Sequence, residues 1–526
     1  MKKLMAILLV ILMLVSVFAS CGGNDETTTT EAPTTEIPTT EAPTTEAPTT
    51  EAPTTEAPTT EAPTTEATTT EAPTTIDPNA PWSSKNDVRD TWSGKTLNVA
   101  CSTWYATGAP WAVMEVFINE ESDANFGAEI QEAVLDRNKF VKNTYGVKVS
   151  WINATKASMH KVLEAATLSK NINYDLAMPR AMNAQELVAG GYLYDMAGRE
   201  FLDFRNSYYN DLSVETYTAY GHTFFVAGDF SNLDKELSAV LYFNKALLGD
   251  GSASTTNELY QMVREGKWTY DKLVSYASAA YSDDGGDGED YGTDTYGMNG
   301  YSFDKYYRYF GVNRAIINEN TGMWELGLND DRVDDIISAI ITTDTANWCF
   351  SAWGGCWGET ALTKFQDNRL LFYNEVVQHT YVCEYGDIGI VPFPMLNEEQ
   401  GRYYVPTSSQ MSVLMCIPKL TLDRAMSEYM LDVLAWTGNE YTMRAYLDMK
   451  AAAFDSEVEM EMLTEYILPN ISYDPGEAVG WGTLINLTES YANNTNNFEQ
   501  FYAEKAPDAL KTIAEWNAAW GGYTEE

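Results

Sequence analysis

Two tryptophans stand among glycines in one short segment of this sequence. The segment Ser351-Ala-Trp-Gly-Gly-Cys-Trp-Gly-Glu359 places Trp353 and Trp357 on a glycine-rich backbone, which predicts a loop. Large aromatic side chains on a loop contribute poorly to a core, and an exposed aromatic plane suits the apolar face of a bound molecule. We predict that Trp353 or Trp357 contacts a ligand, with core packing as the alternative.

Further candidate binding residues follow two of the expected strands. In open α/β folds, ligands bind at the carboxyl ends of the strands, so side chains just beyond those ends are candidates. A basic residue there is notable in so acidic a chain, although a surface ion pair is the competing interpretation. The candidates are Trp104 and Tyr105 after the first expected strand, and Arg180 and Asn183 after the third.

An acidic, glycine-rich loop has the spacing of a calcium-binding loop. Asp283, Asp287 and Asp294 fall at positions 1, 5 and 12 of such a loop, and Gly288 falls at its turn position. Position 3 is Gly285, where an Asp or Asn ligand is usual. The pattern is consistent with a structural calcium site formed by the three aspartates, or with a solvated acidic loop that binds no metal.

The elements that would carry these residues alternate between strand and helix. Strands separated by helices imply right-handed βαβ crossovers, so the first third of the folded part is predicted to be a doubly wound α/β lobe with a mostly parallel sheet. The expected strands are 96–101, 147–152, 174–178, 238–244, 370–375, 388–391 and 411–417, and the expected helices are 125–144, 157–168, 269–281, 332–346, 425–436 and 498–516.

Composition excludes some classes of function. The 526 residues carry 33 basic and 76 acidic side chains, a formal charge of −43. A non-specific nucleic-acid binder needs Lys and Arg to meet the phosphates, and binding to anionic lipid is disfavoured for the same reason. With 44% apolar residues, the chain can still bury a large core.

The first 20 residues read as a lipoprotein signal peptide. Lys2 and Lys3 precede an almost wholly apolar run from Leu4 to Phe18, which is shorter than the roughly 18 residues that favour a membrane span. The small residues before Cys21 resemble a bacterial lipobox, which predicts lipidation of Cys21. An ordinary signal peptide is the alternative, and either one predicts export.

Residues 21–80 are predicted to form a disordered stalk. Glu-Ala-Pro-Thr-Thr recurs every five residues from Glu31 to Thr75. Without apolar side chains this stretch cannot build a core, and its prolines favour extended polyproline II. At about 3.1 Å per residue it could reach on the order of 150 Å. Its threonines are candidate sites of O-glycosylation.

Cysteine and histidine usage argues against a zinc site. No Cys-x-x-Cys pair is present, and the three histidines are far apart in sequence. After Cys21, the chain holds Cys101, Cys349, Cys356, Cys383 and Cys416. One disulfide between Cys349 and Cys356, or free buried thiols throughout, would fit these spacings.

Six short motifs occur in order between Lys95 and Trp520: Gly191-Tyr-Leu-Tyr-Asp-Met196, Gly221-His-Thr-Phe-Phe-Val226, Leu241-Tyr-Phe-Asn-Lys-Ala-Leu247, Lys267-Trp-Thr-Tyr-Asp-Lys-Leu273, Phe365-Gln-Asp-Asn-Arg-Leu-Leu-Phe372 and Ile388-Gly-Ile-Val-Pro-Phe-Pro394. In this order the motifs resemble the extracellular solute-binding proteins of ABC importers, family 1, which includes maltodextrin-binding proteins. Asn368 stands where that family usually has glycine.

The resemblance implies an α/β, two-lobed periplasmic-binding-protein-like fold of type II, formed by residues 81–526. Solute would bind in the cleft between the lobes, and the lobes would close by a hinge motion. Placed by the motifs, the first lobe would hold about 95–230 and 387–438, and the second about 238–385 and 439–526.

The same resemblance adds binding candidates. Gln378 and His379 fall near a position where the family often has an aromatic side chain stacked on the ligand. Tyr473 and Trp481 lie in a late region that supplies another such residue. Trp268, which precedes an expected helix, is predicted to be structural.

The leading hypothesis is a lipid-anchored, extracellular, monomeric solute-binding protein that delivers a neutral oligosaccharide to an ABC permease, without catalysis or an organic cofactor. The strong negative charge disfavours an anionic sugar. A stalked glycoside hydrolase is an alternative, with Glu359 or Asp474 among the many available carboxylates. A cell-surface glycan-binding adhesin is a second alternative, suggested by the stalk.

Overall fold

In the computed structural model, all described residues belong to one compact unit that ends at Glu526. No helix in the described part of the chain is both long enough and apolar enough to cross a membrane. The structure describes residues 88, 90–102, 128–155, 158–171, 173–284, 293–300, 306–327, 332–350, 359–454, 456–476 and 498–525.

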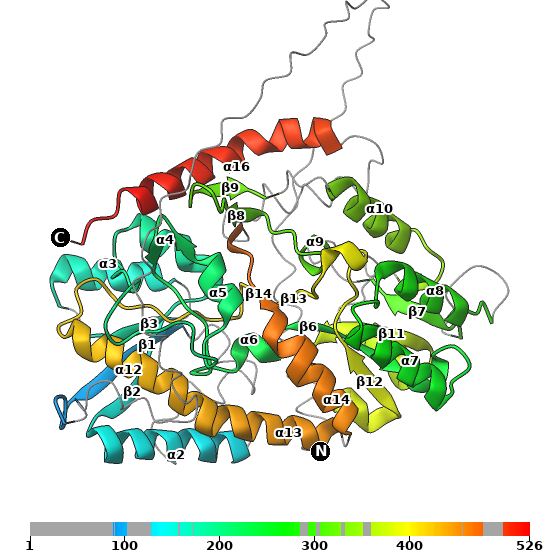
Figure 1. The fold of residues 1–526 in the computed structure, drawn as a ribbon, viewed down its shortest axis with the longest axis horizontal. Coiled ribbons are helices and arrows are strands. Elements are labelled where there is room, and N and C mark those ends of the chain that lie inside the picture. The colour runs from blue at the N-terminus through cyan, green and yellow to red at the C-terminus, as the bar shows by residue number, and fades with distance from the viewer. Residues whose placement is uncertain are drawn as a thin grey trace, which may run out of the picture. The chain divides into compact units, whose positions relative to one another are not determined.

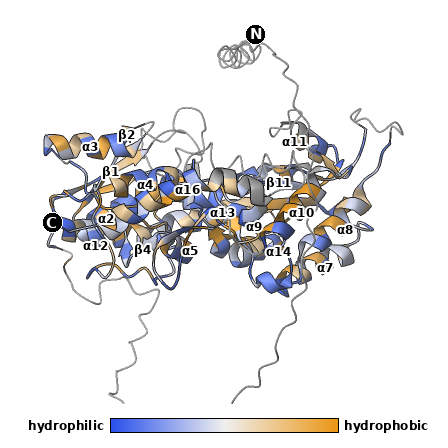
Figure 2. Ribbon diagram, turned by 90° about the horizontal axis from the view of Figure 1, so that it is seen from above, coloured by the Kyte–Doolittle hydropathy of each residue, from blue (hydrophilic) through white to orange (hydrophobic). Residues whose placement is uncertain are grey.

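A three-stranded parallel sheet with the order β2-β1-β3 forms the centre of the first lobe. The strands are β1 (Thr96–Ser102), β2 (Lys148–Thr155) and β3 (Leu176–Met178). Helices α2 (Ala128–Tyr145) and α3 (Met159–Ser169) connect them, as the sequence predicts. In Figure 2, α3 carries both apolar and polar bands, as expected when one face of a helix covers a sheet.

A glycine fixes the turn from α2 into β2. Gly146 has a φ of 68°, and a side chain there would collide with Ser93. Only glycine combines this left-handed backbone with so close an approach. The turn lets β2 begin beside β1, with Lys148 opposite Thr96.

Helix α12 (Arg424–Thr437) is buried from Met426 to its end and packs in the core of the first lobe. The Asp423 side chain caps it by accepting a hydrogen bond from the Met426 N–H and a second from the Trp92 indole. The Trp92 ring also packs against the Tyr429 ring of α12. These contacts hold the N-terminal edge of the lobe against the helix.

The second lobe contains a five-stranded mixed sheet with the order β10-β7-β11-β6-β12. Strand β6 runs antiparallel to both of its neighbours, whereas β7, β10 and β11 are mutually parallel. β6 enters the sheet directly from the first lobe, so no crossover helix forces it to be parallel. The strands are β6 (Ala239–Asn244), β7 (Tyr296–Asn299), β10 (Cys349–Phe350), β11 (Leu370–Val376) and β12 (Ile388–Val391).

The chain returns to the first lobe later than predicted. The predicted boundary places residues 387–438 in the first lobe, but β12 pairs with β6 in the second sheet. The return passes through β13 (Val405–Pro406) and continues antiparallel beside β3. There, the predicted strand 411–417 forms isolated bridges at Val413, Met415 and Cys416. Pro179 has no N–H and interrupts the ladder at the end of β3.

The C-terminal helices contact both lobes. In α13 (Arg444–Phe454), Tyr446 packs with Ile130 and Val134 of α2, although the predicted boundary assigns residues 439–526 to the second lobe. At the other end of the chain, the Trp520 indole in α16 (Phe498–Gly521) donates a hydrogen bond to Gln185, 2.8 Å away in α4 (Ala184–Ala189). Figure 1 shows α16 above the sheets and α13 below them.

The remaining helices and strands connect these layers. They are η5 (Ala181–Asn183), α5 (Asp211–Thr216), β4 (Thr218–Ala219), β5 (His222–Thr223), α6 (Leu233–Glu236), η6 (Lys245–Leu247), α7 (Ala253–Arg264), α8 (Tyr270–Ala280), α9 (Tyr306–Tyr309), β8 (Ala315–Ile317), β9 (Trp324–Leu326), α10 (Val333–Asp344), α11 (Glu359–Gln366), η9 (Val377–Tyr385), η10 (Glu398–Gln400), η11 (Gly438–Met443), α14 (Glu457–Glu461), η12 (Met462–Ile467), η13 (Leu468–Asn470) and β14 (Ile471–Ser472).

A buried carboxyl in α12 predicts a pH dependence of stability. Burial raises the pKa of Asp432 to about 7, although hydrogen bonds from Tyr209 and Tyr208 oppose the rise. The folded state therefore keeps a proton that the unfolded state releases above pH 3.8. The free energy of unfolding should fall by on the order of 4 kcal/mol as the pH rises through this window.

Urea denaturation across the same pH window tests this expectation. Asp432→Asn removes the titrating group and should flatten the slope, while still accepting a hydrogen bond from a tyrosine. If the slope stays the same in Asp432→Asn, other groups are responsible for it.

Candidate functional site

Three segments of the chain cross between the lobes and bond to one another. β13, on the second crossing, pairs in parallel with β14, on the third. Ser238, at the end of the first crossing, forms a bridge with Thr407, which follows β13. In Figure 1, β13, β14 and α6 lie between the two sheets. This bundle is the structural link to which both candidate binding regions are attached.

The turn α6 in the first crossing holds the other two crossings. The backbone carbonyl of Asp234 accepts hydrogen bonds from the Thr407 hydroxyl at 2.9 Å and the Ser238 hydroxyl at 2.7 Å. Its carboxylate accepts a hydrogen bond from the Tyr473 hydroxyl, also at 2.7 Å. One residue thereby bonds to all three crossings.

The next two residues of α6 are also charged: Lys235 is buried and Glu236 is half-buried. The Lys235 ammonium lies 3.1 Å from the Asp229 carboxylate and donates to the Ser231 carbonyl. The Glu236 carboxylate lies 2.6 Å from the ammonium of Lys450 in α13. Buried charges are costly unless they are paired, so each pair constrains the elements that carry it.

Two arginines of the second lobe complete the bundle. Arg308 in α9 is buried and donates from Nη2 to the carbonyls of Thr407 and Ser472. Arg314 forms a buried ion pair with Asp474, with Nε and Oδ2 2.6 Å apart. Asp474 also accepts a hydrogen bond from the Gly476 N–H. This carboxylate is a structural partner of Arg314.

The binding candidates of the first lobe lie next to the second crossing. The N–H of Met182 bonds to the carbonyl of Ser409, two residues after Thr407. Arg180 is half-buried and donates from Nη1 to the Gln410 carbonyl at 3.5 Å. Asn183 is buried where η5 runs into α4. The structure thus places Arg180 and Asn183 beside the crossing bundle.

The candidates of the second lobe lie on the opposite side of the same bundle. The N–H of Val377, at the end of β11, bonds to the carbonyl of Ser238 at 2.9 Å. Gln378 follows directly and is half-buried. The His379 ring stacks on Tyr373, and its Nδ1 lies 3.1 Å from the Tyr373 hydroxyl. A continuous series of backbone and side-chain contacts therefore connects both groups of candidates.

Tyr473, a binding candidate from the sequence, is part of the crossing bundle. Its ring is fully buried beside Tyr217, and burial raises the pKa of its hydroxyl well above the ordinary value. The protonated hydroxyl donates to Asp234, so Tyr473 exposes no face on which a ligand could stack in this structure.

Several candidates lie outside the described residues: Cys21, Trp104, Tyr105, Asp287, Trp353, Cys356, Trp357 and Trp481. Of the acidic loop, Asp294 is buried, and its carboxylate accepts a hydrogen bond from the Asp284 N–H. Asp283 also belongs to the described residues, beside Asp284. Calcium binding there stays a prediction. Cys101, Cys383 and Cys416 are free thiols, and Cys349 is buried.

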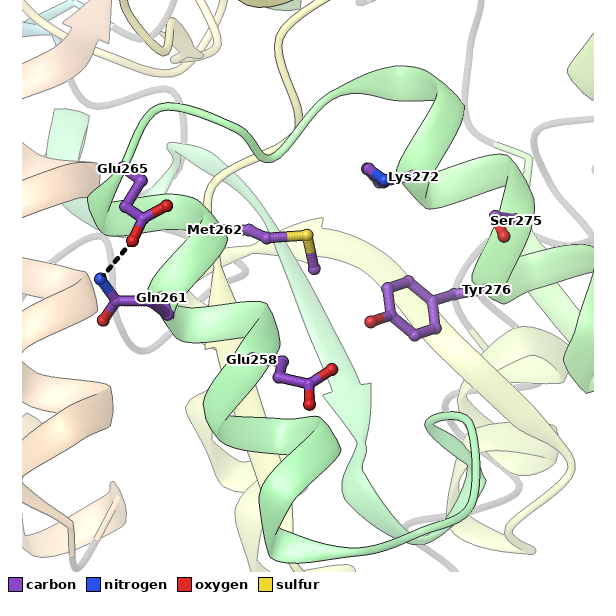
Figure 3. Close-up of a pocket in the computed structure, with 7 residues that line it drawn as sticks. All are labelled: Glu258, Gln261, Met262, Glu265, Lys272, Ser275 and Tyr276. Carbon is purple, nitrogen blue, oxygen red and sulfur yellow. Dashed lines mark hydrogen bonds between the residues drawn. The ribbon is translucent and has the colours of Figure 1, made fainter.

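A hollow of about 480 Å³ lies between α7 and α8 of the second lobe. Figure 3 shows Met262 and Tyr276 pointing into it from opposite helices, while Gln261 bonds to Glu265 along its rim. It contains none of the binding candidates from the sequence. Its lining is mostly exposed helix surface, so we place the candidate site at the crossing bundle.

Sequence patterns missed the charged residues that build the bundle. Asp234, Lys235 and Glu236 form a short acidic-basic-acidic run just before the apolar strand β6, and this run is the one local signal for a buried charged turn. The side-chain partner of Glu236, Lys450, and the hydroxyl partner of Asp234, Tyr473, are far away in sequence. Arg308 gives no local signal because it bonds only to backbone carbonyls among the described residues.

Comparison with solved structures identifies the fold. A cyclo/maltodextrin-binding protein solved with maltotetraose has a TM-score of 0.51 at 15% identity, covering 80% of this chain and 96% of its own. The sugar-binding protein MalE from Xanthomonas citri has a TM-score of 0.52 at 10% identity, covering 82% and 100%. An extracellular solute-binding protein from Staphylococcus aureus solved with maltose has a TM-score of 0.51 at 12% identity, covering 80% and 98%.

These likenesses confirm the predicted two-lobed α/β fold of the periplasmic-binding-protein type. At such low identity they establish the fold alone. No family model and no curated protein matches the chain.

The bond between Tyr473 and Asp234 should contribute to stability. Tyr473→Phe keeps the buried ring but removes the donor to the Asp234 carboxylate. We expect a loss of about 1–3 kcal/mol in the free energy of unfolding, because a buried acceptor loses a partner. Tyr404→Phe, at a half-buried ring beside Arg402, is the control and should change little. Equal stability of the two variants would contradict this account of the bundle.

Proposed function

We propose that this protein is an extracellular, lipid-anchored solute-binding protein of an ABC importer. It captures a neutral oligosaccharide between its two lobes and delivers it to a permease without chemical change. The observation that carries the proposal is the attachment of both candidate groups to one crossing bundle, from Arg180 through Ser409 and Ser238 to Gln378. A rotation about that bundle would bring the two groups toward a shared solute.

Two further observations support a saccharide as the solute. The three compared proteins share this fold, and each is named for a sugar or was solved with one bound. The chain is also rich in aromatic side chains, which provide flat surfaces for the apolar faces of sugar rings. Amide and guanidinium groups such as those of Gln378 and Arg180 suit paired hydroxyls.

The hydrolase alternative loses one of its two proposed carboxylates. Asp474 is fully buried and paired with Arg314, so it is poorly placed to donate a proton to a glycosidic oxygen. The second carboxylate, Glu359, begins α11. Turnover of a glycan panel that disappears in Glu359→Gln would favour a hydrolase over a binding protein.

Saccharide binding should stabilise the purified protein against heat. The panel should contain maltose, maltotetraose, cellobiose and lacto-N-biose. A ligand present at 100 times its dissociation constant adds about 2.7 kcal/mol to the free energy of unfolding. We expect at least one hit, with no hydrolysis products. Heat stability unchanged across the whole panel would contradict a saccharide as the solute.

Arg180→Ala should weaken that binding. Loss of a hydrogen bond from a charged group costs about 1.5–3 kcal/mol, which corresponds to roughly 10- to 100-fold in affinity. The control is Arg205→Ala, which removes an exposed arginine paired with Asp203. It should leave affinity unchanged in a calorimetric titration. Equal affinities of both variants would remove Arg180 from the site.

The lipid anchor is tested in a bacterial host. Cys21→Ser removes the thiol to which the lipid would be attached. The unaltered protein should sediment with membranes and incorporate labelled palmitate, whereas Cys21→Ser should do neither. Membrane association that persists in Cys21→Ser would contradict lipid anchoring at this position.

A further inference from the structure

Lys450 brings a buried positive charge to a point where three elements meet. It belongs to α13, and only 1% of its surface is exposed. Its ammonium lies 2.6 Å from the Glu236 carboxylate in α6. It also donates to the Val377 carbonyl at 3.3 Å and the Thr380 hydroxyl at 3.2 Å, both in η9. A flexible side chain is thereby held by contacts on two sides.

Three hydrogen bonds hold the backbone of Val377 in place. Its N–H bonds to Ser238, at the end of the first crossing. Its carbonyl accepts hydrogen bonds from the Tyr242 hydroxyl at 2.9 Å and from Lys450. Gln378 and His379 begin directly after this residue. The position of these two residues after β11 therefore depends on the contacts that Val377 makes with the first crossing.

Helix α13 also contacts the first lobe. Tyr446, one helical turn before Lys450, packs against α2, and the Lys450 ammonium lies 5.2 Å from the centre of the Tyr446 ring. Lys450 thus joins a helix that contacts the first lobe to a turn of the hinge and to a loop of the second lobe. An apolar side chain of the same length could fill this space but could not connect these elements.

We propose that Lys450 is a positioning residue for solute binding, which holds the start of η9 in register with the hinge turn α6. Movement at the hinge is then transmitted to Gln378 and His379. The proposal rests on the proposed function in one respect, because η9 is taken to be a solute-contacting loop.

Backbone hydrogen exchange without solute tests the connection. In Lys450→Met, amides 378–385 should exchange about tenfold faster, since η9 loses a buried anchor. Arg264→Met, the control, breaks the ion pair between α7 and α14 and should leave these amides unchanged. Thr380→Val, a milder change, should speed the exchange by a smaller factor. Unchanged exchange in both Lys450→Met and Thr380→Val would overturn the proposal.

A double variant separates positioning from simple charge balance. Lys450→Met alone leaves the half-buried Glu236 carboxylate without its paired positive charge, which should lower the thermal midpoint. Adding Glu236→Gln removes that charge and should recover most of the midpoint. If Lys450 positions η9, fast exchange persists in the double variant. Slow exchange restored together with stability would overturn the proposal and leave charge balance as the only role.

These measurements are independent of solute identity. A saccharide panel without a hit would count against the proposed function, while the exchange data would still decide whether Lys450 couples the hinge to η9. Conversely, saccharide binding with normal η9 exchange in Lys450→Met would uphold the function and reject the role of Lys450.

Discussion

The structure depends on a buried, charged turn of four residues between the two lobes. In α6, Asp234, Lys235 and Glu236 are consecutive, and each meets a different partner. Burying the charges of Asp234 and Lys235 and half-burying that of Glu236 is favourable only if every one is paired and hydrogen-bonded. That requirement fixes the third crossing through Tyr473 and the helix α13 through Lys450. A purely apolar turn would make no comparable demand on where its neighbours lie.

The placement of the candidate site follows from this constraint. Ser238 and Thr407 form a bridge between two crossings. The Ser238 carbonyl accepts a hydrogen bond from Val377, which precedes the candidates of the second lobe. Ser409, two residues after Thr407, bonds to Met182 among the candidates of the first lobe. The candidate polar groups are thus carried by both lobes and attached to one crossing bundle. The hollow between α7 and α8 lacks this property, because both of its walls belong to the second lobe. A solute held there would not respond to rotation of one lobe against the other.

Local patterns in the sequence predicted several of the longer strands and helices, but not how they are joined. The strand and helix limits around β1, β11 and α12 agree with expectation, because short apolar runs and helix ends are encoded by nearby residues. The position of the return crossing after β12 was wrong, since pairing with β6 depends on distant contacts. Arg180 could be proposed from its place after a strand, and Gln378 from the family resemblance. Lys450 could not, because its partner Glu236 lies in a different part of the chain.

The most direct test of closure about this bundle is small-angle X-ray scattering from the protein with and without a saccharide that stabilises it. If solute is captured between the lobes, saturation should reduce the radius of gyration, and the reduction should vanish in Arg180→Ala at the same saccharide concentration. Saturable binding with an unchanged radius of gyration would contradict the account. It would place the saccharide on one lobe alone and leave the crossing bundle as a rigid connection.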